Sequence, residues 1–284
     1  MAENVRGDRI EEAIAQYWDG RAESYSNSVR GELGDDRSDA WRRALERASC
    51  SHIAGARAEG RPARILDLGC GPGFFSILFA EMGCKVDAVD ASDEMLARAR
   101  VNAEAMSLGD AIAFLQGDVT ALPFEDGTFD IVASRNLMWL MRDPETAYAE
   151  WMRVLRPGGK LVLFDANWYL YLFDDEIDAR RRADQEGKQV AEWAEDARAT
   201  PEEERRCEQL ALELPLSSVI RPAWDVEVLT ALGAAFIRTD ENAWTDLWTE
   251  SEYSFFSTSP LFMVEALKAA ERPEVLNLYP NSRS

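Results

Sequence analysis

The segment 67–73, with the sequence DLGCGPG, combines one carboxylate with three closely spaced glycines. Glycines lack Cβ atoms, so they let a ligand approach the backbone of a turn closely. Gly69, Gly71 and Gly73 follow the pattern G-x-G-x-G, whereas dinucleotide-binding loops follow G-x-G-x-x-G. Asp67 stands two residues before the first glycine, where it repels a diphosphate and attracts an ammonium group. The loop therefore favours a cationic ligand.

A second carboxylate, Asp90, lies seventeen residues beyond Gly73 and ends a short apolar stretch. An acidic side chain at this place can accept hydrogen bonds from both hydroxyls of a ribose. Asp118 follows the next expected strand and suits an adenine amino group. Together these residues indicate an adenosine that carries an ammonium group. The alternatives are a helix cap for Asp67, a helix N-terminal charge for Asp90 and turn chemistry for Asp118.

Alternating strands and helices are expected to position these side chains. The apolar runs predict strands over 64–68, 85–90, 112–115, 129–134, 161–165, 234–239 and 261–267. Helical patterns and N-caps predict helices over 74–82, from 93 to about 108, from 144, and over 224–232. Residues 157–159 (PGG) are expected to form the turn before the fifth strand. This alternation predicts an α/β, doubly wound and mainly parallel sheet.

Composition excludes several classes of partner and site. The formal charge of −21 repels phosphate backbones and anionic lipid surfaces, so we expect no nucleic-acid partner. The four cysteines form no C-x-x-C pair, and no metal site is expected. Residues 1–4 do not begin a signal peptide, in which a basic segment is followed by an apolar one. No run of residues approaches the roughly 20 apolar residues that a membrane span needs. We therefore predict a cytoplasmic protein with no membrane span.

Residues 65–165 resemble the class I S-adenosylmethionine-dependent methyltransferases of the ubiquinone and menaquinone biosynthesis type, which carry a Methyltransferase-11-like domain. The resemblance rests on five motifs in order, namely 66–73 (LDLGCGPG), 89–92 (VDAS), 117–124 (GDVTALPF), 129–132 (FDIV) and 153–159 (RVLRPGG). It implies a Rossmann-like, seven-stranded sheet with an antiparallel last strand. It also implies S-adenosyl-L-methionine as cofactor, S-adenosyl-L-homocysteine as product and a small-molecule methyl acceptor. The oligomeric state is not predicted.

The N-terminal segment 17–25 (YWDGRAESY) is similar to a segment that folds over the cofactor in many such enzymes. Arg21 suits the methionine carboxylate. The alternative is an amphipathic helix that docks through Tyr17 and Trp18. The expected cofactor-binding residues are Tyr17, Arg21, Tyr25, Asp67, Gly69, Gly71, Gly73, Asp90, Ala91, Met95, Asp118, Val119, Arg135 and Asn136.

Helical segments are expected on both sides of this core. The pattern from about residue 7 to residue 60 is helical, and a charged, helix-favouring stretch covers about 174–213. Its charge runs, 180–182 and 202–204, are expected on solvated helix faces. The predicted organisation has an N-terminal helical segment (1–60) that covers the cofactor site, a Rossmann-like core (61–167 and 222–270) and a helical cap (168–221).

The acceptor pocket should lie outside the carboxyl ends of the strands. Its expected residues are Trp139, Asn167, Trp168 and Tyr169, which suit an aromatic or amphipathic acceptor, although these rings can instead pack the cap onto the core. A sulfonium is an activated leaving group, so positioning and desolvation can supply much of the catalysis. No catalytic residue is assigned. The candidates are Asp165 and Tyr17, and the alternative for Asp165 is a structural hydrogen-bond network.

Other residues and motifs bear on competing functions. The single histidine, His52, lies in the N-terminal helical region and is expected on a helix surface. Residues 134–137 (SRNL) depart from the D/N-P-P-aromatic motif of DNA amino-methylating enzymes. The rival functions are a nicotinamide-dependent oxidoreductase on a similar sheet and a noncatalytic S-adenosylmethionine-binding module.

Overall fold

The computed structural model describes residues 2–186 and 199–270. Its described residues contain one mixed sheet with the strand order β3-β2-β1-β4-β5-β7-β6. Strands β1 to β5 are parallel, and β7 is antiparallel to both β5 and β6. The strands are β1 Arg64–Leu68, β2 Lys85–Asp90, β3 Ile112–Gln116, β4 Phe129–Arg135, β5 Leu155–Asp165, β6 Ala234–Asp240 and β7 Phe262–Lys268. The predicted Rossmann-like, seven-stranded sheet with an antiparallel last strand is confirmed.

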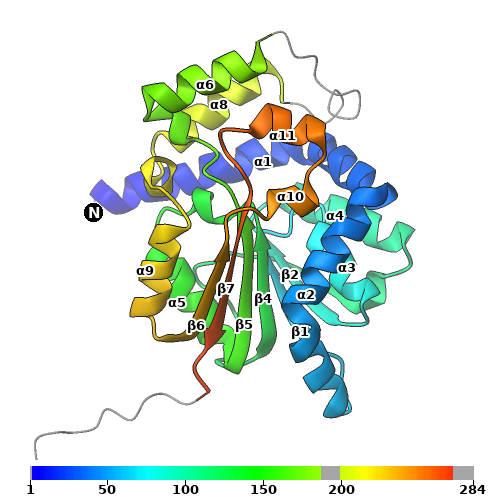
Figure 1. Ribbon diagram of the computed structural model, residues 1–284. Coiled ribbons are helices and arrows are strands. Elements are labelled where there is room, and N and C mark those ends of the chain that lie inside the picture. The colour runs from blue at the N-terminus through cyan, green and yellow to red at the C-terminus, as the bar shows by residue number, and fades with distance from the viewer. Residues whose placement is uncertain (1, 187–198, 271–284) are drawn as a thin grey trace, which may run out of the picture.

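Alternate residues of the strands point to two separate cores. Ile65 of β1 and Ile131 of β4 pack on one side of the sheet, and their neighbours Leu66 and Val132 pack on the other. The first side is covered by α2 (Asp36–Ala58), α3 (Phe74–Glu81) and α4 (Asp93–Ala105), and the second by α5 (Pro144–Val154) and α9 (Ala223–Ala231). Both faces are buried, as a parallel sheet with crossover helices requires, and Figure 1 shows this doubly wound arrangement.

Strand β5 corrects one expectation from the sequence. It begins at Leu155, six residues earlier than predicted, and runs through the expected turn at 157–159. Gly158 adopts a φ of 74°, and the pairing with β4 shifts register between Phe129 and Ile131. Extra residues opposite one strand form a bulge, which bends the chain without ending the pairing. The proline and glycines therefore mark a bulge inside the strand.

Helix ends follow the caps that the sequence contains. Ser92 accepts a hydrogen bond from Met95 N (3.0 Å) at the start of α4, and Asp143 accepts one from Thr146 N (3.0 Å) at the start of α5. Helix α4 ends at Ala105, earlier than the predicted end near residue 108. Ser107 takes a φ of 61°, which a continuing right-handed helix does not allow.

The predicted N-terminal helical segment is present and forms two helices. Helix α1 spans Ala2–Gly34, and Asp35 then caps α2 by accepting a hydrogen bond from Arg37 N (2.9 Å). Figure 1 shows α1 crossing above the carboxyl ends of the parallel strands, and α2 descending along one face of the sheet. This course places the middle of α1 over the expected cofactor site.

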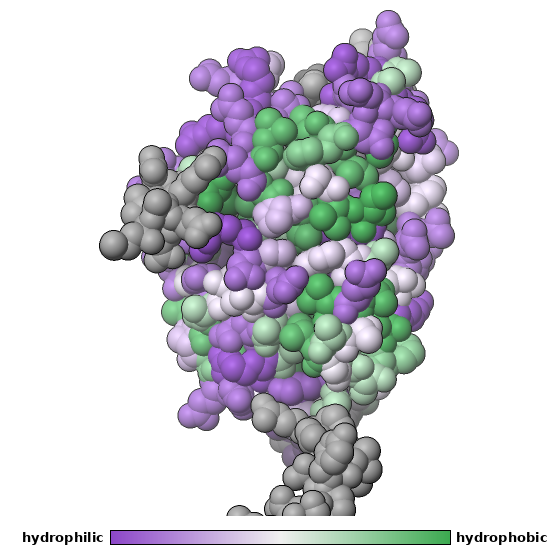
Figure 2. All heavy atoms as spheres, turned by 90° about the vertical axis from the view of Figure 1, so that its left-hand side faces the viewer, coloured by the Kyte–Doolittle hydropathy of each residue, from purple (hydrophilic) through white to green (hydrophobic). Residues whose placement is uncertain are grey.

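A cap of short helices lies above α1 in Figure 1. It contains α6 (Asp175–Gln185) and α8 (Pro201–Ala211), with 3₁₀ turns η3 (Leu170–Leu172) and η4 (Pro215–Ser218). The rest of the charged stretch, 187–198, lies outside the described residues. Figure 2 shows the top of the molecule as largely hydrophilic, in keeping with solvated outer faces on these helices.

Helices α10 (Trp244–Leu247) and α11 (Glu250–Phe256) were not predicted. They are inserted between β6 and β7, within the range 222–270 that the sequence assigned to the core. Figure 1 shows them beside the cap, at the same end of the sheet. The sequence does contain a signal for α11, because Thr249 and Glu252 form a capping box.

Candidate functional site

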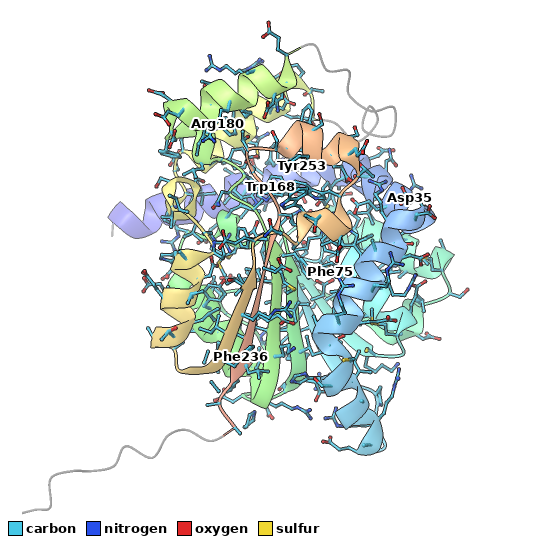
Figure 3. The ribbon with its side chains drawn as sticks, viewed as in Figure 1. Asp35, Phe75, Trp168, Arg180, Phe236 and Tyr253 are labelled. Atoms are coloured by element: carbon cyan, nitrogen blue, oxygen red, sulfur yellow. The ribbon has the colours of Figure 1, made fainter. Side chains whose placement is uncertain are left out.

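The carboxyl ends of the parallel strands, α1, the cap and α11 enclose a cavity of about 930 Å³. This volume lies within the range of small-molecule sites. Figure 3 shows Trp168 above the strand ends, between the sheet and the helices that cover it. The cavity therefore occupies the place that the sequence predicted for both the cofactor and the acceptor.

The glycine loop forms one wall of this cavity. Gly69 and Gly71 line it and adopt φ values of 59° and 51°, which favour glycine. A Cβ atom at Gly69 would lie 2.6 Å from a terminal carbon of Leu137, so that side chain would have to move. Gly73 precedes the first residue of α3 and does not line the cavity. The loop thus offers bare backbone to a ligand at two of its three glycines.

Asp90 lies at the end of β2 and lines the cavity. Its Oδ2 accepts a hydrogen bond from Gly71 N (2.8 Å), and its Oδ1 accepts one from Ser92 N (2.9 Å). Each carboxylate oxygen has a second lone pair that can accept a ligand hydroxyl. Burial raises the pKa of Asp90, whereas these backbone hydrogen bonds lower it. The side chain is therefore fixed in place with two acceptor positions left over.

Asp67 is buried behind the glycine loop and does not line the cavity. Its Oδ2 accepts a hydrogen bond from Ser76 Oγ (2.5 Å) in the first turn of α3. Burial raises the pKa of Asp67 to about 7, against the opposing effect of the hydrogen bonds from Ser76. Its contacts are those of the alternative, a helix cap. Attraction of an ammonium group across the loop stays a prediction.

Helix α1 brings part of the expected N-terminal set to the cavity. Tyr17 and Tyr25 line it, as does Trp18, which packs edge-to-face on both tyrosines at ring distances of 5.2 and 5.6 Å. Burial raises the pKa of Tyr17, so this phenol keeps its proton at neutral pH. Arg21 is not brought to the cavity wall, because it forms an ion pair with Glu203 of α8 at 3.5 Å.

The remaining expected cofactor residues also lie on the wall, namely Ala91, Met95, Asp118, Val119, Arg135 and Asn136. Asp118 Oδ1 accepts hydrogen bonds from Thr120 N and Thr120 Oγ1, both at 2.7 Å, so it also serves the turn. Arg135 pairs with Glu32 at 2.8 Å and lies over the Trp41 ring at 4.5 Å. Arg135 therefore places a cation on the cavity wall, whereas Arg21 does not reach that wall.

The acceptor half of the cavity is aromatic. Trp139, Trp168 and Tyr169 line it as expected, and the Trp139 and Tyr169 rings lie 4.6 Å apart. Sequence reasoning missed further lining residues of this half, among them Arg181, Cys207, Glu208, Phe255 and Phe256. Phe255 and Phe256 come from the unpredicted helix α11. The cap and α11 therefore complete the half of the cavity that faces away from the glycine loop.

Comparisons with known proteins agree with this geometry. Residues 66–163 match the family model of a methyltransferase domain. A demethylmenaquinone methyltransferase from Thermus thermophilus is 42% identical over 109 residues, which cover 38% of this chain and 49% of that protein. A demethylmenaquinone methyltransferase from Streptomyces avermitilis is 35% identical over 159 residues, 55% of this chain and 61% of that protein. The chain spans about half the length of these relatives.

Residues 66–163 therefore belong to a methyltransferase domain of the class I, S-adenosylmethionine-dependent type. The fold of the domain agrees with a solved structure, a Haemonchus contortus phosphoethanolamine N-methyltransferase 2 in complex with phosphomonomethylethanolamine and S-adenosylhomocysteine. That structure has a TM-score of 0.50 and 17% identity, and the likeness covers 73% of this chain and 49% of that one. The five motifs found in the sequence all fall within or next to the matched range.

Asp165, at the end of β5 of the methyltransferase domain, is fully buried and does not line the cavity. Its Oδ2 lies 2.6 Å from Arg221 Nη1, and its Oδ1 accepts hydrogen bonds from Ala166 N (2.9 Å) and Trp168 Nε1 (3.1 Å). Arg221 also pairs with Asp225 at 2.7 Å. Burial raises the pKa of Asp165, and Arg221 opposes this effect. The structure thus gives Asp165 the contacts of the structural alternative.

Asn167 also serves the structure of the methyltransferase domain in this arrangement. It does not line the cavity, because its amide exchanges two hydrogen bonds with the Arg221 backbone. Asn167 Nδ2 donates to Arg221 O (2.9 Å), and Arg221 N donates to Asn167 Oδ1 (3.0 Å). These bonds join the start of the cap to its end.

The single histidine does not reach the cavity. His52 is partly buried on α2, and its Nε2 lies 2.9 Å from Gly158 O, away from the cavity. Within the described ranges, no three His, Cys, Asp or Glu side chains form a group that could hold a metal ion. Among the helices that the structure describes, none is long and apolar enough to cross a membrane.

Proposed function

We propose that the protein transfers a methyl group from S-adenosylmethionine to a small-molecule acceptor. The observation that carries this proposal is the single cavity that joins the glycine loop and Asp90 to an aromatic wall at the carboxyl ends of the strands. Gly69 and Gly71 would face the methionine part of the cofactor, and Asp90 would accept the ribose hydroxyls. Asp118 and Val119 would lie beside the adenine.

The proposed chemistry is an in-line displacement at the methyl carbon. The sulfonium is already activated, so the chain's main contributions would be orientation of the acceptor and exclusion of water. Tyr17 keeps its proton and Asp165 lies outside the cavity, so neither is assigned as a base. The aromatic half, capped by α11 and Trp168, would hold the acceptor against the methyl group.

The ribose assignment is tested with Asp90→Ala. We expect the variant to lose about 1 to 3 kcal/mol of S-adenosylhomocysteine binding in calorimetry, the scale of charge-assisted hydrogen bonds. Asp87→Ala is the control, since Asp87 lies on the same strand but pairs with Arg64 outside the cavity. Unchanged affinity in Asp90→Ala would remove the assignment of this carboxylate to the ribose.

The same calorimetry separates the rival functions. Binding of a nicotinamide dinucleotide without binding of S-adenosylhomocysteine would replace the proposal by an oxidoreductase. Tight binding of S-adenosylhomocysteine, with no methyl transfer from S-adenosylmethionine across a wide acceptor panel, would favour a noncatalytic binding module. Binding together with transfer to a small molecule is the expected result.

A further inference from the structure

The side-chain donors around the aromatic half of the cavity are turned toward the protein. Each of five lining residues donates its hydrogen to a protein group rather than to the cavity. The bonds are Trp139 Nε1 to Asn136 O (3.1 Å), Trp168 Nε1 to Asp165 Oδ1 (3.1 Å), Tyr169 OH to Cys207 Sγ (2.9 Å), Tyr171 OH to Glu208 Oε1 (2.7 Å) and Ser259 Oγ to Asn167 O (3.0 Å). The wall therefore offers few hydrogens to a ligand.

The same wall is rich in hydrogen-bond acceptors. A hydroxyl that donates its only hydrogen can still accept, so Tyr169 and Tyr171 act as acceptors toward the cavity. The Glu208 carboxylate adds two oxygens. Asn136 lies where the two sides meet, between Tyr25 and Trp139, and its Oδ1 is buried with no hydrogen-bond partner in the part of the chain that the structure describes. Leaving such an atom unpaired costs about 1 to 3 kcal/mol, which a donor on the ligand would recover.

Two donors are exceptions, namely Trp18 Nε1 and Arg135 Nε, because each is buried and has no hydrogen-bond partner among the described residues. Both residues lie beside Tyr25, whose ring is the nearest group to a Cβ built at Gly71. These two donors therefore belong to the cofactor side of the cavity. They do not add hydrogens to the acceptor side.

The arginines on the described cavity wall are already paired with carboxylates. Arg135 pairs with Glu32 at 2.8 Å, and Arg142 pairs with Glu11 at 2.9 Å. Arg181 pairs with Asp178 at 3.0 Å and lies 3.9 Å from the centre of the Tyr171 ring. An anionic acceptor would have to compete with these carboxylates for its cation. The acceptor side thus disfavours phosphate and carboxylate groups.

We propose that the methyl acceptor is an amine with an aromatic or apolar body, an inference that rests on the proposed methyltransferase function. The N–H groups of an amine suit the acceptor oxygens of Tyr169, Tyr171 and Asn136. The faces of Trp139 and Trp168 attract a cation as well as an apolar body. The formal charge of −21 would also concentrate organic cations near the protein.

The reaction requires the amine without its extra proton. The bound ammonium first loses one proton to solvent, which frees the nitrogen lone pair. That lone pair forms the N–C bond while the C–S bond electrons move to sulfur. The products are an N-methylammonium and neutral S-adenosylhomocysteine, so the positive charge passes from sulfur to nitrogen. The acceptor-rich wall stabilises the cation both before and after transfer.

The test uses three probes of similar shape on protein saturated with S-adenosylhomocysteine. We expect 2-phenylethylamine to bind at least tenfold more tightly than 2-phenylethanol in calorimetry, and phenylacetate to bind most weakly. Tyr171→Phe and Glu208→Gln should reduce the preference for the amine over the alcohol at least threefold. Glu202→Gln is the control, because Glu202 is exposed on the same helix and does not line the cavity.

The outcomes separate this inference from the proposed function. If S-adenosylhomocysteine fails to bind, the methyltransferase function itself fails. If it binds but the alcohol or the carboxylate equals the amine, the methyltransferase function stands and the amine inference is overturned. A preference for the amine that survives both Tyr171→Phe and Glu208→Gln would also overturn it, because the named wall would not be its source.

Discussion

The two halves of the cavity differ in how the chain builds them. The cofactor half comes from the loops after β1, β2 and β3, between residues 69 and 119, together with α1 and the end of β4. The acceptor half comes mainly from the cap and from α11, which are insertions around the same sheet, together with Trp139 in the turn after β4. Apart from α1, the first half follows from the fold of the sheet, whereas the second depends mainly on the helices added to it. Selectivity for an acceptor can therefore change while the cofactor half stays the same.

A buried ion network attaches the added half to the fold. Arg221, the last residue of the cap, joins Asp165 of β5 to Asp225 of α9, and both carboxylates are fully buried. Tyr148 of α5 also donates a hydrogen bond to Asp225. Removal of one partner from such a network leaves uncompensated buried charge. Substitution of Arg221 is thus expected to lower the free energy of unfolding more than the other substitutions considered below.

We predict that Arg221→Leu lowers the free energy of unfolding by about 3 to 5 kcal/mol, because two buried carboxylates lose their cation. Arg221→Lys should lose less, since it keeps the charge but not the two-pronged geometry. Denaturant unfolding measures both. The control is Arg238→Leu, which removes a half-exposed partner of Glu265 and should cost no more than about 1 kcal/mol. Equal losses in the two leucine variants would contradict the anchoring role.

Ionisation of Asp67, in the cofactor half, is expected to have an intermediate effect on the free energy of unfolding. Its pKa rises from about 3.9 in an unfolded chain to about 7 in the folded protein. Between these values the folded state binds more protons, so the unfolding free energy due to Asp67 falls as the pH rises. Asp67→Asn keeps an acceptor for Ser76 but cannot ionise.

We therefore predict that wild type loses about 2 to 3 kcal/mol more stability than Asp67→Asn when the pH rises from 5 to 8. Urea unfolding at the two pH values measures this difference. Asp87→Asn is the control and should follow wild type, since Asp87 is paired with Arg64. Parallel pH profiles for wild type and Asp67→Asn would show that Asp67 titrates normally.

The same contrast explains how much the sequence could predict. The bounds of β1 and β2 were predicted as observed, because short apolar runs with clear limits determine them locally. Most of the expected cofactor residues line the cavity, since the carboxyl ends of parallel strands converge. The bulge in β5 was missed because it depends on the register with β4. Helix α11 was missed although Thr249 and Glu252 signalled its start.

Partners that are distant in sequence account for the remaining differences. Arg21 suits a ligand carboxylate, but its partner in the structure is Glu203, 182 residues further along the chain. Asp165 stands at the end of a strand, where catalytic carboxylates are common, yet its partner Arg221 lies 56 residues away. No local pattern announces either pair. Which polar groups face a ligand is therefore decided by tertiary pairing, which a single sequence does not reveal.

The ion pair between Arg21 and Glu203 is expected to contribute least to the free energy of unfolding. It also tests whether Arg21 belongs to the cofactor half or to the cap. Glu203 occupies the third position of α8 and completes a capping box with Thr200, which glutamine also supports. Glu203→Gln thus removes the charge of the partner while it keeps the helix cap. Because the ion pair is partly exposed, we predict a loss of no more than about 1 kcal/mol in denaturant unfolding.

Calorimetry with S-adenosylhomocysteine then decides which half Arg21 serves. If Arg21 holds the cap, Glu203→Gln and Arg21→Met should each leave the affinity within twofold of wild type. If Arg21 binds the methionine carboxylate, Arg21→Met should weaken binding at least tenfold, and Glu203→Gln should strengthen it by releasing a competing anion. The contacts in the structure favour the first outcome, because Arg21 faces α8 rather than the cavity. The second outcome would show that the cofactor site extends to Arg21, beside the cap.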